Sequence, residues 1–263
     1  MSRSENESEK HFVLVHGAGH GAWCWYKVAT LLRSAGHRVT ALDMAASGVN
    51  PKQLKELRSW TDYFQPLMEF MKLLPADDKV VLVGHSAGGV SISVAMERFP
   101  EKVSLGVFVT AIMHGPGLAL STVMEKCFAG IESFMDCPNE FDRGLDKPPT
   151  SLLFGPKFMQ SMLYEQSPPE DLSLATTLMR PYPLFHDNEE MEKDTALTRK
   201  NQGSVRRVYI VIEEDRSLKA SFQRWMIENN PTDEVKVISG ADHMVMLSKP
   251  EELSSCLQEL AAN

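Results

Sequence analysis

The stretch Lys79-Val-Val-Leu-Val-Gly-His-Ser86-Ala-Gly-Gly89 decides the fold of this chain. An apolar run of strand length ends at Gly84, and residues 90–99 repeat with the period of a helix. A Gly-x-Ser-x-Gly pattern between a strand and a helix is typical of a tight turn that exposes one serine Oγ at the end of a sheet. The bare pattern also occurs in flexible loops, but here a strand and a helix flank it. We therefore predict that Ser86 is a nucleophile, and that Gly84 and Gly88 lie where a Cβ would clash with neighbouring backbone.

Strand and helix patterns alternate on both sides of this turn. Apolar runs of strand type occupy residues 11–15, 38–42, 79–83, 103–110, 207–212 and 234–238. Helical patterns occupy residues 23–32, 60–73, 90–99, 218–228 and 250–262. Such alternation predicts an α/β fold in which helices cover both faces of a mostly parallel sheet.

The alternation fails between His114 and about Asn201. That segment holds nine of the fifteen prolines, helical pieces at 121–128 and 171–179, and no clear central strand. Its Leu, Met and Phe content is too high for a disordered linker. We predict a core of residues 11–112 and 202–263, a largely helical cap inserted at 113–201, and a disordered tail at 1–10.

Composition excludes several classes of function. The chain has 263 residues, 43% of them hydrophobic, and a formal net charge of −8, which disfavours nucleic acid and anionic membranes as partners. No apolar stretch approaches the roughly 18 residues that span a bilayer, and the first ten residues lack the apolar core of a secretory signal. The four cysteines lack metal-binding spacing, so we expect reduced thiols in a cytoplasmic protein with no metal site.

Two later strands end at residues that suit a serine nucleophile. Asp215 follows the strand at 207–212, and His243 follows the strand at 234–238, which gives the chain order Ser, Asp, His. In this arrangement His243 takes the proton of Ser86 during attack, and Asp215 orients and stabilises the imidazole. Glu213 and Glu214 also lie close to the end of the strand at 207–212, so both stay open as alternatives to Asp215 for the acid. Asp242 is a weaker candidate, because adjacent side chains tend to diverge.

The negative oxygen that forms during attack needs two backbone N–H donors. We predict that one donor is the N–H of Ala87, directly after the nucleophile. The other is expected to be the N–H of Ala18, in the loop His16-Gly-Ala-Gly19 after the first strand. The glycines could instead only make a tight turn or bind phosphate, but their spacing fits neither dinucleotide-binding nor Walker loops. We expect His16 to organise this loop and His85 to pack or hydrogen-bond beside the turn.

The chain resembles the plant methylesterase group of α/β-hydrolases. This group includes salicylate, jasmonate and indole-acetate methylesterases, an indole-alkaloid esterase of the polyneuridine aldehyde type, and plant hydroxynitrile lyases. The matching stretches are His11–Ala18, Gly21–Lys27, Gly36–Asp43, Ala46–Gly48, the Ser86 turn, Phe99–Val103, Phe222–Ile227 and Ala241–Met244. The resemblance implies hydrolysis of a methyl ester through a serine acyl-enzyme, with Ser86, Asp215 and His243 as the triad, Ala18 and Ala87 as oxyanion donors, and no cofactor or metal.

Three departures from the family pattern bear on the reaction. The similar lyases carry threonine and lysine where this chain has Gly17 and Met244, and without that ammonium group cyanohydrin cleavage is disfavoured. Some similar ketone-forming relatives, which act on β-keto acids, have lost the serine and the acid that this chain retains. Many family esterases have Ile-Pro after the acid, whereas this chain has Ser217-Leu218-Lys219, which could loosen the Asp215 loop.

The cap is expected to set specificity for a small-molecule ester, because its apolar side chains close over the serine. The candidate pocket residues are Gly17, Trp25, Ala87, Met113, Phe134, Phe154, Met159, Leu163, Tyr164, Leu178, Met179 and Met244. Such side chains also pack in hydrophobic cores, so the pattern alone does not separate pocket from core. The sequence leaves open a β-keto or β-formyl ester as substrate, a non-catalytic receptor on the same fold, and whether the chain forms a homodimer.

Overall fold

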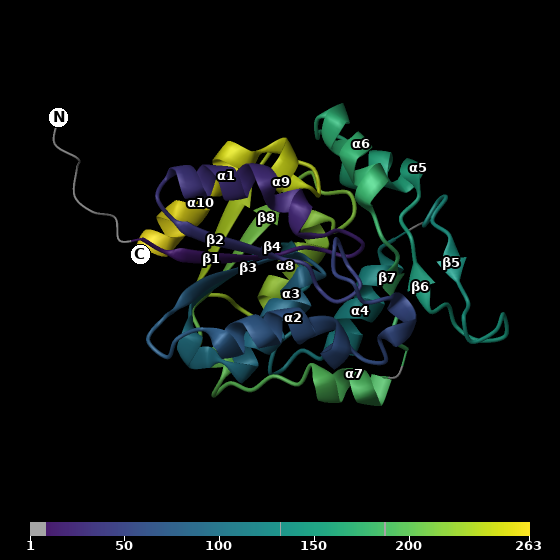
Figure 1. Ribbon diagram of the computed structural model, residues 1–263, viewed down its shortest axis with the longest axis horizontal. Helices are drawn as coiled ribbons and strands as arrows, with labels where there is room; N and C mark the ends of the chain where they lie inside the picture. The colour runs from purple at the N-terminus through teal and green to yellow at the C-terminus, as the bar shows by residue number, and fades with distance from the viewer. Residues whose placement is uncertain (1–8, 132, 187) are drawn as a thin grey trace.

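The centre of the computed structural model, which describes residues 9–131, 133–186 and 188–263, is a six-stranded parallel sheet (Figure 1). The strand order is β2-β1-β3-β4-β8-β9. The strands are β1 (His11–Val15), β2 (Arg38–Leu42), β3 (Val80–Ser86), β4 (Val103–Ala111), β8 (Arg207–Ile212) and β9 (Glu234–Ile238). The parallel sheet confirms the predicted α/β fold class, and every predicted strand is present.

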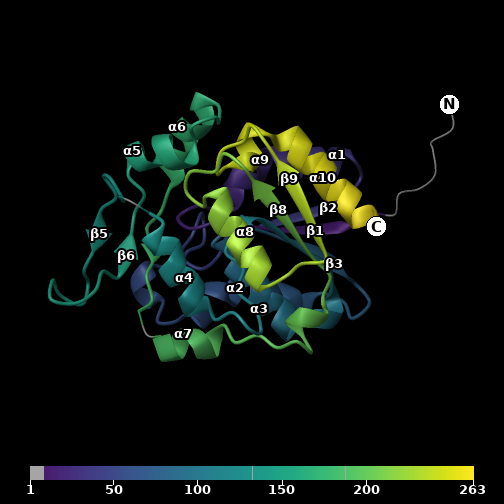
Figure 2. The same ribbon diagram turned by 180° about the vertical axis from the view of Figure 1, so that it is seen from behind.

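Helices cover both faces of this sheet. One face carries α1 (Tyr26–Ser34), α9 (Val245–Ser248) and α10 (Pro250–Ala262), which lie together in both views (Figures 1 and 2). The other face carries α2 (Trp60–Leu73), α3 (Gly88–Arg98), α4 (Leu120–Ala129) and α8 (Ala220–Asn229). Parallel strands need such crossovers, and the covering helices explain why the inner strands β1, β3, β4 and β8 are mostly continuous apolar runs rather than alternating ones.

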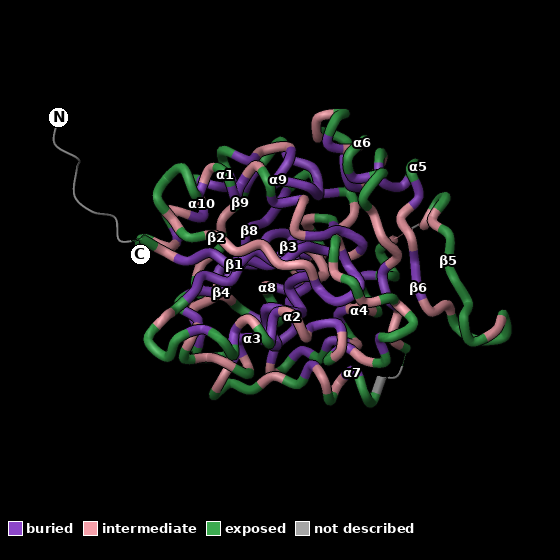
Figure 3. Tube along the Cα trace, viewed as in Figure 1, coloured by how far each residue is buried: buried purple, intermediate pink, exposed green. Residues whose placement is uncertain are grey.

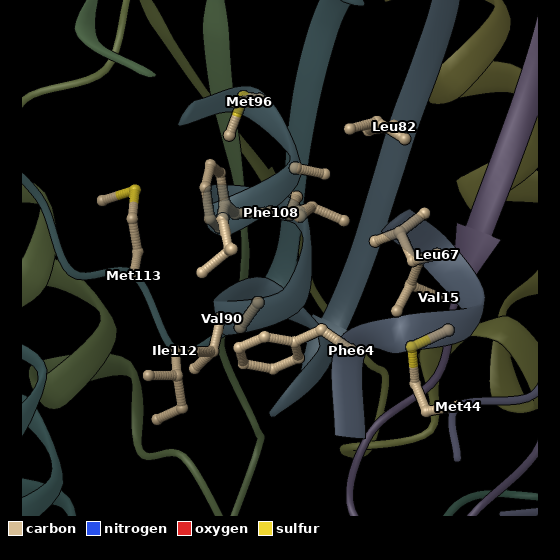
Figure 4. Packing of buried hydrophobic residues seen from close by; sticks show 14 of the residues in the cluster. Val15, Met44, Phe64, Leu67, Leu82, Val90, Met96, Phe108, Ile112 and Met113 are labelled. Atoms are coloured by element: carbon tan, nitrogen blue, oxygen red, sulfur yellow. The ribbon is translucent and has the colours of Figure 1, made fainter. Parts of the chain in front are cut away.

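Successive strand residues point to opposite faces, which sorts the core into two clusters. In β3, Val81 and Val83 pack with α1 and α10, whereas Val80 and Leu82 pack with α2 and α3. The close-up in Figure 4 shows the second cluster, in which aromatic, aliphatic and methionine side chains from α2, α3 and β4 meet. Burying one such side chain stabilises the fold by about 1.5–3 kcal/mol.

The segment predicted as a cap contains more than helices. It holds α5 (Pro156–Phe158), a π-helix (Met159–Leu163), α6 (Pro169–Leu178) and α7 (Asn188–Asp194), but also a small antiparallel sheet. The strands of that sheet are β5 (Asn139–Glu140), β6 (Ser151–Leu152) and β7 (Tyr182–Pro183). Two-residue strands carry no readable period, so the sequence pattern missed them.

Parts of this segment pack against the core, and other parts lie outside it. Helix α4 contacts α8, and α7 contacts α2, so both belong spatially with the core helices. The small sheet, α5 and α6 lie to one side of the main sheet, and β5 is exposed (Figure 3). Of the predicted tail at 1–10, residues 1–8 lie outside the described residues, and the Lys10 carbonyl accepts the Arg38 N–H at 2.9 Å.

Candidate active site

Ser86 is the last residue of β3 and adopts a left-handed backbone conformation with φ +53°. Few residues other than glycine adopt this conformation, and at a strand end it directs the side chain out of the sheet. A Cβ at Gly84 would lie 2.8 Å from the Gly88 carbonyl oxygen, and one at Gly88 would lie 2.7 Å from the His16 carbonyl oxygen. These approaches confirm the predicted clashes, and they allow α3 to begin directly behind the serine.

The loop after β1 lies against the nucleophile. A Cβ at Gly17 would come within 2.7 Å of Ser86 Cβ and 3.3 Å of Ser86 Oγ. Only a glycine therefore lets this loop approach the hydroxyl so closely. The following residue, Ala18, is the one that sequence reasoning chose as an oxyanion donor.

His16 fixes the direction of the peptide that carries the Ala18 N–H. Its Nε2 accepts the Met44 N–H at 3.0 Å, so its proton lies on Nδ1, which donates to the Gly17 carbonyl at 2.7 Å. Because a trans peptide is planar, the Ala18 N–H points away from the carbonyl that His16 holds. Burial lowers the pKa of His16, so the neutral ring keeps this arrangement. His16 thus organises the loop, as expected, by setting one peptide plane.

Asp215 and His243 form a buried pair at the ends of β8 and β9. His243 Nδ1 lies 2.6 Å from Asp215 Oδ2, and each residue is only 3% exposed. The other carboxylate oxygen accepts the N–H groups of Ser217 and Leu218, both at 2.8 Å. The loop that departs from the family's Ile-Pro is therefore held by the carboxylate itself.

Thr110 is a further partner of Asp215 that sequence reasoning missed. The register between β3 and β4 shifts between His85 and Ser86, so that Thr110 is an extra residue, with φ +36°. Bulges of this kind redirect side chains near functional sites. Here the Thr110 hydroxyl donates to Asp215 Oδ2. This contact depends on strand register, so no local motif signals it.

The competing carboxylates have other partners. Ser239 Oγ donates to Glu213, and the Gly240 N–H donates to Glu214 Oε2 at 2.7 Å. Asp242 Oδ2 accepts the Gln166 N–H at 2.9 Å and the Ser167 hydroxyl at 2.8 Å. Among these four carboxylates, Asp215 is the one hydrogen-bonded to the His243 ring.

His85 connects the nucleophile turn to the His243 loop. Its Nε2 donates to the His243 carbonyl at 2.8 Å, and the two ring centroids are 4.6 Å apart. Burial, reinforced by the neighbouring His243, holds the pKa of His85 well below its usual value. A neutral ring whose N–H is committed to a backbone carbonyl supports the adjacent residues rather than titrating with them, as expected from its place beside the turn.

Apart from Gly17 and Ala87, which lie next to Ser86, the predicted pocket residues fall into three groups: buried core residues, the end of α6, and an aromatic pair. Those that are at most 2% exposed and packed in the two core clusters are Trp25, Met113, Met159, Leu163, Tyr164 and Met244. Leu178, in contrast, is 37% exposed at the last position of α6. The chain turns extended at the next residue, and the Met179 Sδ lies 2.7 Å from where a Gly19 Cβ would be. Of these two neighbouring candidates for the pocket wall, Met179 therefore lies beside the oxyanion loop and Leu178 is partly exposed.

Phe154 and Phe134 belong to an aromatic row that leads away from the oxyanion loop. Phe154 lies beside Gly19 and stacks on Phe158 at 5.3 Å, and Phe158 stacks on Phe134 at 6.1 Å. Phe134 in turn lines a cavity of about 660 Å³ between α2, α4, α7 and the small sheet. A cavity of this size is within the range of small-molecule sites.

The described residues include no cluster of three His, Cys, Asp or Glu side chains that could hold a metal ion. All four cysteines are free thiols. Within the same described ranges, no helix is both long enough and apolar enough to cross a bilayer.

Comparison with known proteins gives long matches. The sequence profile of the alpha/beta hydrolase family matches residues 12–255. Methyl jasmonate esterase 1 of Vitis vinifera is 60% identical over 96% of this chain and 97% of its own. Norfluorocurarine synthase 1 of Strychnos nux-vomica is 47% identical over 97% of this chain and 96% of its own. The crystal structure of tomato methylketone synthase I complexed with 2-tridecanone superposes with a TM-score of 0.93, at 50% identity, over 97% of this chain and 98% of that one.

Proposed function

Because the chain belongs to the alpha/beta hydrolase family, we propose that it is a serine methylesterase acting on a small plant metabolite. The observation that carries this proposal is the buried His243–Asp215 pair, joined through His85 to the turn that bears Ser86. The similarity to methyl jasmonate esterase 1 favours a methyl jasmonate-like ester as the first substrate to test. We also propose that residues 11–112 and 202–263 form the catalytic core of this enzyme and that residues 113–201 form its cap.

The proposed reaction follows from the hydrogen bond between the His243 ring and Asp215. His243 Nδ1 is bound to Asp215, so Nε2 is the nitrogen that accepts the Ser86 proton as Oγ attacks the ester carbonyl. The N–H groups of Ala18 and Ala87 stabilise the negative oxygen of the tetrahedral intermediate. The imidazolium then protonates the departing methanol, and water releases the acid from the acyl-enzyme by the same steps in reverse order. Asp215 stabilises the imidazolium throughout.

The acyl group is proposed to lie along the aromatic row from Phe154 toward Phe134. This row of rings begins beside Gly19 of the oxyanion loop and ends at Phe134, which lines the cavity. Met179 supplies a flexible wall that adapts to different ring systems. Of the residues expected in the pocket, this proposal retains Gly17, Phe134 and Phe154 as ligand contacts.

A second candidate reaction is hydrolysis of a β-keto or β-formyl ester, followed by loss of carbon dioxide from the free acid. The 50% identity to tomato methylketone synthase I favours this candidate. Cyanohydrin cleavage is disfavoured, because Met244 is fully buried in an apolar cluster and offers no ammonium group.

Product analysis with paired variants tests the proposal. The parent and Ser86→Ala are assayed with p-nitrophenyl acetate and with methyl jasmonate, methyl salicylate, methyl indole-acetate and a β-keto methyl ester. We expect Ser86→Ala to lose about 10⁶-fold in kcat while keeping its fold. Free acid as the product identifies the methylesterase, and a decarboxylated ketone identifies the second candidate. Turnover that survives in Ser86→Ala rejects both, and saturable binding of the free acid without turnover by the parent identifies a receptor.

A further inference from the structure

A buried row of hydrogen bonds joins the cap to the loop that carries Ala18. The Tyr164 hydroxyl lies 2.7 Å from His20 Nε2, and His20 Nδ1 lies 2.8 Å from the Ala18 carbonyl oxygen. Tyr164 and His20 are 144 residues apart in sequence, and each is 2% exposed. Their rings also stack, with centroids 5.9 Å apart.

The chemistry of the three groups fixes the direction of these hydrogen bonds. A carbonyl oxygen only accepts, so His20 Nδ1 carries the proton that points at Ala18. Burial lowers the pKa of His20 to about 3, so the ring is neutral near neutral pH and has one N–H. Nε2 is therefore an acceptor, and the Tyr164 hydroxyl donates to it. Without the Tyr164 hydroxyl, the His20 ring loses the contact that favours the tautomer protonated at Nδ1. That tautomer is the one that donates to the Ala18 carbonyl.

Two histidines thus hold the two peptides that flank Ala18. His16 holds the Gly17 carbonyl, and His20 holds the Ala18 carbonyl. Because peptides are planar, fixing both of them fixes the two backbone dihedrals of Ala18 between them. His16 sets the plane of the peptide that carries the Ala18 N–H, and His20 holds the next peptide against rotation about the Ala18 backbone. The tautomer of His20 that makes this contact in turn depends on Tyr164.

The same stretch of the cap also reaches the loop that carries His243. The Met244 N–H donates to the Leu163 carbonyl at 3.3 Å. Asp242 accepts the Gln166 N–H and the Ser167 hydroxyl with one carboxylate oxygen, and the Met244 N–H at 3.0 Å with the other. The five residues from Leu163 to Ser167 therefore contact both loops of the site.

We propose that the cap segment 163–167 positions both catalytic loops, and that Tyr164 is the positioning residue of the oxyanion site. The inference rests on the proposed esterase function. It assigns Tyr164 a different role from the pocket contact expected from sequence, because its hydroxyl is committed to His20. The cap then contributes to the rate of the chemical step as well as to the choice of ester.

Tyr164→Phe tests the proposal, with Tyr26→Phe as a matched control. The Tyr26 hydroxyl also joins the core to the cap, through Asp171 of α6 at 2.9 Å, but it contacts neither catalytic loop. Complete loss of one oxyanion donor lowers kcat about 10²- to 10³-fold, so misalignment is expected to lower it about tenfold. We expect Tyr164→Phe to show this loss in kcat at unchanged KM, and Tyr26→Phe to keep the parental kcat.

Three results would overturn the proposal. One is an unchanged kcat in Tyr164→Phe. Another is a raised KM at constant kcat, which would make Tyr164 a substrate contact. The third is an equal loss in Tyr26→Phe, which would show general loosening of the cap.

A second pair of variants decides the matter if Tyr164→Phe fails to fold. The amide nitrogen of asparagine can replace His20 Nδ1, whereas glutamine can replace only Nε2. His20→Asn is expected to retain more kcat than His20→Gln at similar KM, and the reverse order refutes the role of the Ala18 contact. A parent no more active than Ser86→Ala refutes the proposed function, whereas an active parent matched by Tyr164→Phe refutes this inference alone.

Discussion

Asparagine in place of Asp215 is expected to lower kcat for ester hydrolysis about 10⁴-fold while leaving the fold intact. The change removes a charge and keeps the size of the side chain. Four donors contact this carboxylate, from His243, Thr110, Ser217 and Leu218. Their arrangement decides how the amide of asparagine would lie.

The two backbone N–H groups on Oδ1 require an oxygen there, because an NH₂ group in that place would face two donors. The amide nitrogen of the introduced asparagine would therefore replace Oδ2 and donate toward His243 Nδ1. That nitrogen must then accept, which moves the imidazole proton to Nε2, where it cannot take the proton of Ser86. A loss of 10⁴-fold corresponds to about 5.4 kcal/mol of barrier.

The assay compares kcat of the parent, Asp215→Asn and Glu214→Gln with p-nitrophenyl acetate and with the best methyl ester. Glu214 is the matched control, because its carboxylate is adjacent in sequence but bonds the Gly240 N–H instead of the imidazole. Thermal unfolding of all three checks the fold. If Asp215→Asn keeps more than about a tenth of the parental kcat, or if Glu214→Gln loses as much, the assignment of the acid is refuted.

Three further predictions concern residues around the site and the core. Gly17→Ala is expected to lower kcat about tenfold or more, because its methyl group would meet Ser86 Cβ, whereas Gly117→Ala, in open space, keeps it; equal kcat values contradict the close approach. His85→Gln keeps a donor for the His243 carbonyl, so urea denaturation should show it to be about 1–3 kcal/mol more stable than His85→Leu, and equal stabilities contradict this role. Burial lowers the pKa of His114 to about 4, so as the pH falls this histidine is protonated in the unfolded chain before it is protonated in the folded protein. His114 alone should therefore lower the unfolding free energy by roughly 3 kcal/mol between pH 6.5 and 4, in addition to the falls from the other buried histidines. His114→Gln should remove that part of the fall in urea titrations, and an unchanged pH dependence would refute the assignment.

The main sheet could be predicted because its inner strands β1, β3, β4 and β8 are buried, mostly apolar runs bounded by turn residues. Burial on both faces gives parallel strands this signature, and it does not depend on distant contacts. The cap has no such signature. Its strands are two residues long, and α7 is an acidic helix with little apolar periodicity, so their positions come from tertiary packing.

The chain order of Ser86, Asp215 and His243 predicted that an acid after β8 would meet a histidine after β9, and the structure pairs Asp215 with His243. It left Glu213 and Glu214 open as the acid. Thr110 could not be found in this way, because its contact arises from a register shift between two strands. Tyr164 shows a different limit. Its apolar setting suggested a pocket wall, but its hydroxyl bonds a histidine 144 residues away, which no local pattern encodes.

Covalent labelling of the nucleophile tests the central claim most directly. A fluorophosphonate reacts with an activated serine, displaces fluoride and leaves a stable adduct that resembles the tetrahedral intermediate. Intact-mass spectrometry of the labelled parent should show one adduct per chain, and peptide mapping should place it on Ser86. Ser86→Ala should show none under the same conditions. A parent that stays unlabelled, or an adduct on another residue, would contradict the serine mechanism.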